Sequence, residues 1–210
     1  MENAVSENTQ IRPEVKKELI SLPMISKKGS LSFEEVLSSR KSVRKFSSKE
    51  LDWNQTGQLL WAVQGVQFVN KKKKTSPSAG STYPLTAYVV CSEGVFKYLP
   101  EEHKLLVIVQ GDHRTALSMA ALEQKWVAEA PLSVILTGIY ERTEERYGAR
   151  GRTYVQMEAG HAAQNLHLQA VSLGLGSVPV GAFIDSKVAQ IIRCREGEIP
   201  LYILPVGYSE

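Results

Sequence analysis

The order of strand-like and helix-like segments places the strongest limit on how this chain can fold. Short apolar runs with the composition of buried strands occur five times, at Leu85–Cys91, Val95–Leu99, Leu105–Gln110, Leu132–Gly138 and Ile199–Val206. Helical patterns lie before, between and after these runs, but they do not alternate with them one for one. Because a doubly wound Rossmann domain requires that alternation, we exclude it and predict an α+β fold.

Capping patterns mark the starts of two helices. In Ser32-Phe33-Glu34-Glu35 a serine precedes a glutamate by three positions, which is a capping box and predicts a helix to about Ser39. Asp52-Trp53-Asn54-Gln55 opens a second helix in the same way, and Gly65 is expected at its C′ position. Further helices are predicted from their patterns at Thr115–Ala128, Thr153–Leu173 and Ser186–Arg193.

Length and composition fit one domain with an arm. The 210 residues are 43% hydrophobic and 22% charged, which is ordinary for a globular protein. We expect residues 1–30 to form a polar N-terminal arm, with a short helical piece near Pro13–Leu19, and residues 31–210 to form the domain. A formal net charge of +3 is too small to favour nucleic-acid binding. The basic run Lys71–Lys74 fits a solvated loop, and it also fits local attraction of an anionic cofactor or substrate.

The sequence lacks the signals of export, membrane insertion and metal binding. Its start, Met1–Gln10, is polar, and its apolar runs are far shorter than the ~20 residues that span a bilayer. Only two cysteines occur, and the four histidines have no metal-binding spacing. We therefore expect a cytoplasmic protein with no membrane segment, no disulfide framework and no metal.

The segment Arg40-Lys41-Ser42-Val43-Arg44 has the residue types of a phosphate site. In an extended chain, residues two apart share a face, so Arg40, Ser42 and Arg44 would point the same way. A guanidinium group stays charged and binds phosphate through two parallel hydrogen bonds. Taken alone, the Arg-x-Ser-x-Arg pattern also fits a basic surface turn, so the segments farther along the chain decide between the two.

Two glycine-containing segments farther along the chain suit a planar ligand. The first, Pro77–Ser81, has the small residues of a turn, which also let a backbone approach a ring closely. In the second, Gly174–Phe183, the first glycine fits a helix cap, but a cap does not explain Gly176, Pro179 and Gly181 together. Glycines there expose backbone N–H groups. Since a phosphate, a polyol and a flat heterocycle are the three parts of FMN, the three segments together predict a flavin site.

In this order and spacing, the segments resemble the FMN-dependent nitroreductase family and, within it, the SagB-type dehydrogenases. The resemblance runs from about Leu31 to Gly207 and implies a central, mainly antiparallel sheet surrounded by helices. It also implies a homodimer with two flavin sites at its interface. By this resemblance, Arg40, Ser42 and Arg44 hold the FMN phosphate and the ribityl chain.

The resemblance also implies the contacts around the flavin ring. The loop that lines the ring, often from across the dimer interface, comprises Pro77, Ser78, Ala79, Gly80 and, more weakly, Ser81. Pro179 and Val180 lead to Gly181, whose backbone N–H would donate to flavin N5 and stabilise the electron density that arrives with a hydride. Gln64-Gly65 is expected to face the ring as well.

Tyr147 is a second expected catalytic residue beside Gly181. SagB-type enzymes that oxidise peptide azolines to azoles resemble the chain around Tyr147–Gly151, where a Lys-Tyr pair is linked to proton removal. The pair in this chain is Arg146-Tyr147. Arg146 is a poor general base, because burial does not neutralise an arginine. Tyr147 is then expected either to act as an acid or base or simply to pack.

The resemblance implies an FMN-dependent oxidoreductase of the nitroreductase type. NADH or NADPH would give a hydride to flavin N5, and an electron-poor small molecule such as a nitro compound or a quinone would then take the electrons, in a ping-pong sequence. Two alternatives stay open: a SagB-type dehydrogenase of peptide azolines, and a flavin-binding subunit without turnover. Since the sequence stops at Glu210 without a basic tail, Arg40 and Arg44 are expected to carry most of the phosphate charge.

Overall fold

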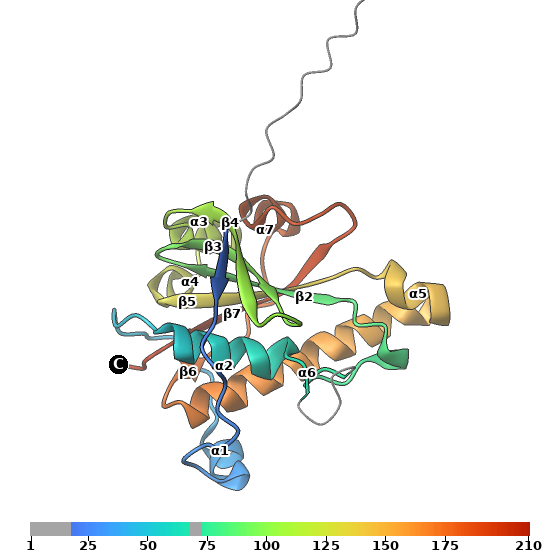
Figure 1. The fold of residues 1–210 in the computed structure, drawn as a ribbon. Coiled ribbons are helices and arrows are strands. Elements are labelled where there is room, and N and C mark those ends of the chain that lie inside the picture. The colour runs from blue at the N-terminus through green and yellow to red at the C-terminus, as the bar shows by residue number, and fades with distance from the viewer. Residues whose placement is uncertain (1–17, 68–72) are drawn as a thin grey trace, which may run out of the picture.

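The computed structural model describes residues 18–67 and 73–210. They form a seven-stranded sheet in the order β1-β4-β3-β2-β5-β7-β6, in which every neighbouring pair is antiparallel (Figure 1). The predicted α+β fold with its mainly antiparallel sheet is confirmed. The strands are β1 Leu19–Ser21, β2 Leu85–Cys91, β3 Gly94–Leu99, β4 Lys104–Gln110, β5 Leu132–Gly138, β6 Gly176–Ser177 and β7 Ile199–Gly207.

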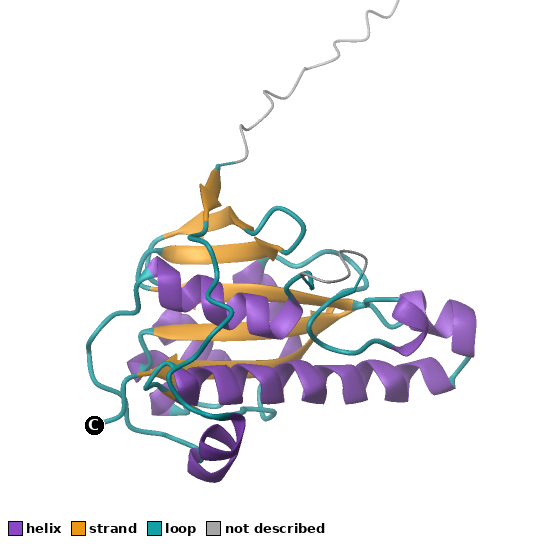
Figure 2. Cartoon of the chain, turned by 60° about the horizontal axis from the view of Figure 1, so that its bottom comes forward, coloured by secondary structure: helices purple, strands orange, loops and turns teal. Residues whose placement is uncertain are grey.

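Helices cover both faces of the sheet. They are α1 Phe33–Ser39, α2 Trp53–Gln64, the 3₁₀ turn η1 Ala79–Ser81, α3 Arg114–Ala120, α4 Lys125–Glu129, α5 Glu141–Tyr147, α6 Arg150–Ser172 and α7 Asp185–Ile192. In Figure 1, α2 and α6 lie below the sheet and α3 and α7 lie above it, and Figure 2 shows α6 running alongside the strands. None of the helices in the described residues is long and apolar enough to cross a membrane.

The central strands are buried on both faces. Successive side chains of a strand point to opposite sides, so in β2 Val89 packs with α2 and α6 and Val90 packs with α3 and α7. Strands buried in this way read as continuous apolar runs rather than as alternating ones. That is why the five predicted strands agree with the structure to within one residue at each end.

Both predicted capping boxes are present. Ser32 and Glu35 exchange backbone-to-side-chain hydrogen bonds at the start of α1, and Asp52 and Gln55 do the same at the start of α2. Gly65, however, ends α2 in an extended conformation, with φ −65° and ψ 156°, and not in the left-handed one of a C′ glycine. A Cβ there would stand 2.1 Å from the Trp61 ring, so close approach to Trp61 is what requires glycine at this position.

The helix predicted at Thr115–Ala128 is wrong in one respect, because the structure divides it into α3 and α4. Leu122 and Glu123 between them have left-handed backbones, with φ of 56° and 60°. The Gln124 amide donates to the Ala121 carbonyl at 2.8 Å and to the Ala182 carbonyl at 2.9 Å. The break is held by this contact with a segment distant in sequence, and the local sequence has neither glycine nor proline to signal it.

The N-terminal segment is attached to the domain from Glu18 on. Leu19 pairs with β4, so the helical piece predicted near Pro13–Leu19 is wrong at Leu19, and its first five residues lie outside the described part of the chain. Farther along, the Ser26 N–H donates to the Gln58 side-chain oxygen at 2.8 Å, and the Gln58 amide donates to the Ser26 carbonyl at 3.0 Å. This exchange fixes the segment across α2.

Candidate functional site

The Arg40–Arg44 segment and strand β6 lie side by side. Ser42 forms a parallel bridge with Ser177, and the Val43 N–H donates to the Ser177 carbonyl at 3.0 Å. A Cβ on Gly176 would stand 2.6 Å from the Val43 side chain, so the contact needs a glycine there. The structure therefore brings together two of the three segments that were expected to form one site, and it shows the first of them extended.

Arg40 and Arg44 have positive charge available for a ligand. In residues 18–67 and 73–210, neither guanidinium forms an ion pair with a carboxylate. The Arg44 guanidinium lies over the Trp126 ring, 5.7 Å from its centroid, a contact that uses none of its N–H donors. Ser42, between them, is exposed. Two such guanidinium groups and a hydroxyl group fit a phosphate ester on a polyol.

His167 on α6 contacts β6 through Ser177. Its Nδ1 atom lies 2.6 Å from the Ser177 hydroxyl oxygen, and in the described residues its Nε2 atom has no hydrogen-bond partner. Burial, assisted by the nearby charge of Arg40, lowers the pKa of His167 to about 4. The imidazole is therefore neutral at physiological pH, and it positions Ser177 without adding charge.

The Pro179–Gly181 segment runs against β7 and presents a free backbone donor. Val180 is buried, and it exchanges backbone hydrogen bonds of 2.8 and 3.0 Å with Ile203, so it anchors its neighbours instead of offering polar groups. Pro179 and Gly181 are exposed. Within the described part of the chain, the Gly181 N–H donates to no acceptor, which leaves it available to a ligand.

The Pro77–Ser81 loop contacts α5 instead. Gly80 has a φ of +58°, which favours glycine, and a Cβ there would stand 2.8 Å from the Tyr147 hydroxyl oxygen. The Arg146 guanidinium donates to the Gly80 carbonyl at 3.3 Å, and the Tyr147 ring meets Tyr154 edge-on, 5.1 Å between centroids. Tyr147 therefore lies with the loop and not with Gly181.

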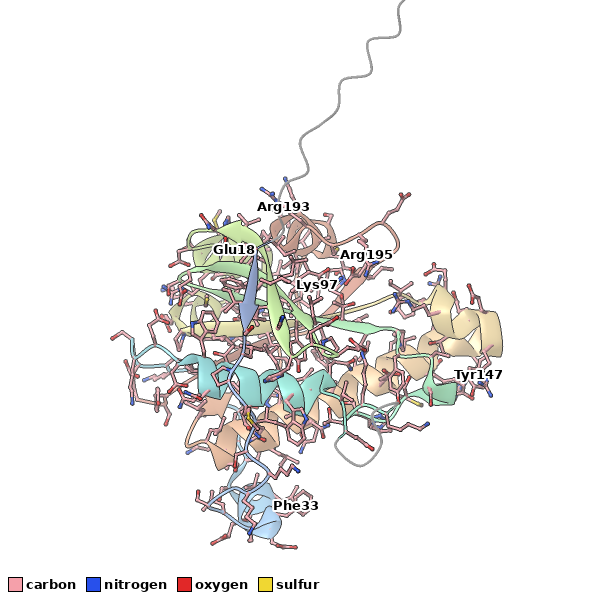
Figure 3. All side chains as sticks on the ribbon, viewed as in Figure 1. Glu18, Phe33, Lys97, Tyr147, Arg193 and Arg195 are labelled. Carbon is pink, nitrogen blue, oxygen red and sulfur yellow. The ribbon has the colours of Figure 1, made fainter. Side chains whose placement is uncertain are left out.

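One chain does not assemble these parts into a single site. The loop and Tyr147 are near the start of α6, at one end of the molecule (Figures 1 and 3), whereas β6 and the Arg40–Arg44 segment are near the end of α6. With 23 residues, α6 is about 35 Å long at 1.5 Å per residue. The two groups of residues expected to form the site, called half-sites below, therefore lie at the two ends of this helix.

The sequence analysis did not identify Glu158 and gave Gln64 only a minor role, and both are buried polar residues near the loop. Glu158 on α6 is 2% exposed and lies beside Ser78. Its sequence signal is a carboxylate that lies one helical turn from the buried Val155. Gln64 is fully buried at the end of α2, where it faces a cavity of about 210 Å³ that Lys74 also lines. In the described residues neither amide atom of Gln64 has a partner, and no group of three His, Cys, Asp or Glu side chains is arranged to hold a metal.

Known proteins resemble the chain over nearly its whole length. A protein of Methanocaldococcus jannaschii that is named as a nitroreductase is 43% identical over 194 residues, which cover 90% of this chain and 95% of that one. An iodotyrosine dehalogenase 1 homolog of Caenorhabditis elegans is 26% identical, over 88% of this chain and 57% of that one. The crystal structure of a Ralstonia eutropha nitroreductase superposes with a TM-score of 0.81 at 28% identity, covering 91% of this chain and 90% of that one.

The match to a family as a whole agrees with these pairwise comparisons. The profile described as "Nitroreductase family" matches residues 37–208, which include the Arg40–Arg44 segment, the Pro77–Ser81 loop and Gly181. On this match and on the 43% identical relative, the chain belongs to the nitroreductase family of oxidoreductases.

Proposed function

We propose that the protein is an FMN-dependent oxidoreductase that passes electrons from NADH or NADPH to an electron-poor small molecule, such as a nitro compound or a quinone. Two observations on the described residues carry this proposal. Arg40 and Arg44, on the segment beside β6, have no carboxylate partner. The Gly181 N–H, which follows the bridge between Val180 and β7, has no acceptor. The two guanidinium groups fit a phosphate, and the Gly181 N–H fits an electron-rich ring nitrogen. FMN supplies the hydride chemistry when it is bound.

The residues of this chain would bind FMN, orient it and polarise its ring. Arg40 and Arg44 would neutralise the phosphate, and Ser42 would contact the polyol. The Gly181 N–H would donate to N5 and favour the electron-rich form, because a fixed dipole aimed at developing charge needs no reorganisation. Gln124 holds the chain just after this donor, since its side-chain amide donates to the Ala182 carbonyl at 2.9 Å, two peptides beyond the Gly181 N–H.

We further propose that the site is completed in a homodimer. The Pro77–Ser81 loop and Tyr147 lie at the end of α6 opposite to β6 and the Arg40–Arg44 segment, so a second copy would have to supply them. Large apolar side chains are exposed on α1 and α6, among them Phe33 at 63% and Met157 at 50%, and Figure 3 shows Phe33 on the helix that stands away from the sheet. Covering these side chains would favour association.

The phosphate assignment is tested by Arg40→Ala with Arg44→Ala. Each charge-assisted hydrogen bond is worth about 1.5–3 kcal/mol, so the double variant should lose FMN during purification while wild-type protein keeps its visible flavin bands. Lys41→Ala with Lys45→Ala is the matched control, because it removes two exposed charges from the same segment. Full flavin in the arginine variant would place the phosphate elsewhere, and wild-type protein that binds no FMN would refute the proposed function.

The position of Tyr147 is also compatible with a second function, that of a SagB-type dehydrogenase of peptide azolines. Tyr147 borders the loop that would face the ring, but Arg146 beside it bonds to the Gly80 carbonyl and cannot act as a base. Tyr147→Phe should therefore leave reduction of a quinone nearly unchanged. Loss of that activity would make Tyr147 part of the chemistry. Bound flavin that no nicotinamide bleaches would instead favour a peptide reductant or a subunit without turnover.

A further inference from the structure

A buried carboxyl group lies behind the Pro77–Ser81 loop. Glu158 is 2% exposed, and among the described residues its Oε1 atom has no hydrogen-bond partner. Ser78, on the loop, lies beside the same carboxyl group, and both residues line one surface depression. A buried polar atom without a partner is destabilising and is uncommon in folded proteins, so structure alone does not account for a carboxyl group at this position.

A surface depression reaches this carboxyl group. Its volume is about 290 Å³, and its lining consists of Pro77, Ser78, Ala79, Tyr154, Met157, Glu158 and His161. Met157 and His161 are exposed at its rim, whereas Glu158 is buried. Protons can therefore pass between bulk water and Glu158 without any movement of the loop.

The surroundings of Glu158 allow both of its charge states. Burial raises its pKa to about 7, and the Ser78 hydrogen bond and the positive charge of Lys74 oppose the rise. Lys74 is itself largely buried, and burial lowers its pKa. The other titratable groups at the depression are Tyr154 and His161 on α6, with Tyr147 of α5 packed edge-on against Tyr154. Glu158 is thus able to hold a proton and to release it near neutral pH.

Ser78 is oriented for proton transfer. The Tyr83 N–H donates to its Oγ atom at 2.9 Å. This bond occupies one lone pair of the oxygen and directs the hydroxyl proton elsewhere. One side chain therefore connects the buried carboxyl group to the loop that, under the proposed function, faces the acceptor.

We propose that Glu158 and Ser78 form a proton relay for the acceptor. The inference rests on the proposed function, in which the loop borders the reacting centre. A quinone that receives a hydride needs one further proton to become a hydroquinone. Ser78 gives its hydroxyl proton to the quinone oxygen and takes the proton of Glu158, which leaves a carboxylate. That carboxylate regains a proton from water through the depression, so every proton is accounted for.

The test compares two acceptors in rapid-mixing experiments on reduced, flavin-loaded protein. Benzoquinone takes a proton with its electrons, whereas ferricyanide takes electrons alone. Glu158→Gln keeps the size of the side chain but carries no exchangeable acid, and Ser78→Ala breaks the relay at its second member. Glu145→Gln, on the exposed face of α5, is the matched control. His161→Gln is a second control, because His161 lines the same depression as Glu158.

We expect both relay variants to react with benzoquinone at least about tenfold more slowly than wild type near pH 7, and with ferricyanide at an unchanged rate. The wild-type benzoquinone rate should fall as the pH rises through about 7, and this dependence should vanish in Glu158→Gln but persist in His161→Gln. A merely structural role would slow both acceptors equally, and that result would overturn the relay.

A measurement without flavin separates the relay from the proposed function. The infrared carbonyl band of a protonated carboxyl group should disappear from flavin-free wild-type protein as the pH rises through about 7, and it should be missing in Glu158→Gln. A band that does not titrate would overturn the relay. Wild-type protein that holds flavin and reacts equally fast as both relay variants would overturn the relay alone, whereas wild-type protein that never binds flavin would overturn both proposals.

Discussion

Glu158→Gln should change the pH dependence of stability in a defined direction. Burial raises the pKa of this carboxyl group from 4.5 to about 7, so the folded protein favours the neutral form. Its contribution is fully present below pH 4.5 and is lost as the pH rises through about 7. Each tenfold change in proton affinity is worth about 1.4 kcal/mol, so the loss in the free energy of unfolding should be roughly 3 kcal/mol.

The pH dependence of wild-type stability would not by itself show this loss, because His167 changes the free energy of unfolding in the opposite direction. Burial lowers its pKa from 6.5 to about 4, so the folded protein disfavours the charged imidazole. Stability is then lost as the pH falls from 6.5 through about 4. The two effects overlap in one pH window and partly cancel, and the informative quantity is the difference between variant and wild type.

Urea unfolding of the flavin-free proteins from about pH 5 to about pH 8 measures that difference. Glutamine does not titrate, so the stability of Glu158→Gln relative to wild type should rise by roughly 2.5 kcal/mol across this range, since part of the change falls below pH 5. The exposed control Glu145→Gln should stay within about 0.5 kcal/mol of wild type. A difference between Glu158→Gln and wild type that is the same at every pH would refute a buried carboxyl group that titrates near neutrality.

Three other substitutions test the half-site at the end of α6. Gly176→Ala should cost about 1–3 kcal/mol in urea unfolding and weaken FMN retention, because its Cβ would stand 2.6 Å from the Val43 side chain; tight FMN binding by a stable variant would contradict that role. His167→Gln should remove a loss of roughly 3 kcal/mol between about pH 7 and about pH 4, and parallel stability curves would argue against a buried neutral imidazole. Gly181→Pro removes a backbone N–H, so it should leave FMN bound but slow its reduction by NADH or NADPH roughly 10²-fold or more in stopped-flow absorbance; an unchanged rate would exclude that donor.

The central sheet was predictable because its strands are buried on both faces, which produces apolar runs with clear ends. Strands β1 and β6 were not predictable, since three- and two-residue strands carry no periodic pattern. β6 forms only because the Gly207 end of β7 and the Arg40–Arg44 segment lie on either side of it. Its structure is decided by partners that are distant in sequence.

The sequence indicated which residues to examine for a site but not how they are arranged. Residue chemistry indicated the Arg40–Arg44 segment and Gly181, and the structure places both beside β6 and β7. Residue chemistry also indicated the Pro77–Ser81 loop, and the family resemblance indicated Tyr147, but no local pattern reveals that a long helix separates them from the Arg40–Arg44 segment. His167 was considered only as a metal ligand, for which its spacing from His161 is unsuitable, and its bond to Ser177 is a tertiary contact.

The geometry of α6 places one buried titratable group beneath each half-site. At 100° per residue, Glu158 and His167 fall on opposite edges of the apolar stripe that Val155, Ala159 and Leu166 follow. One edge faces the Pro77–Ser81 loop, through Ser78, and the other faces β6, through Ser177. Glu158 lowers stability toward the upper end of the range between about pH 4 and about pH 7, and His167 lowers it toward the lower end. An apolar residue at either position would avoid that cost. Selection for stability alone would have removed both, so their presence under the two segments that would contact the cofactor and its acceptor argues that each has a role there.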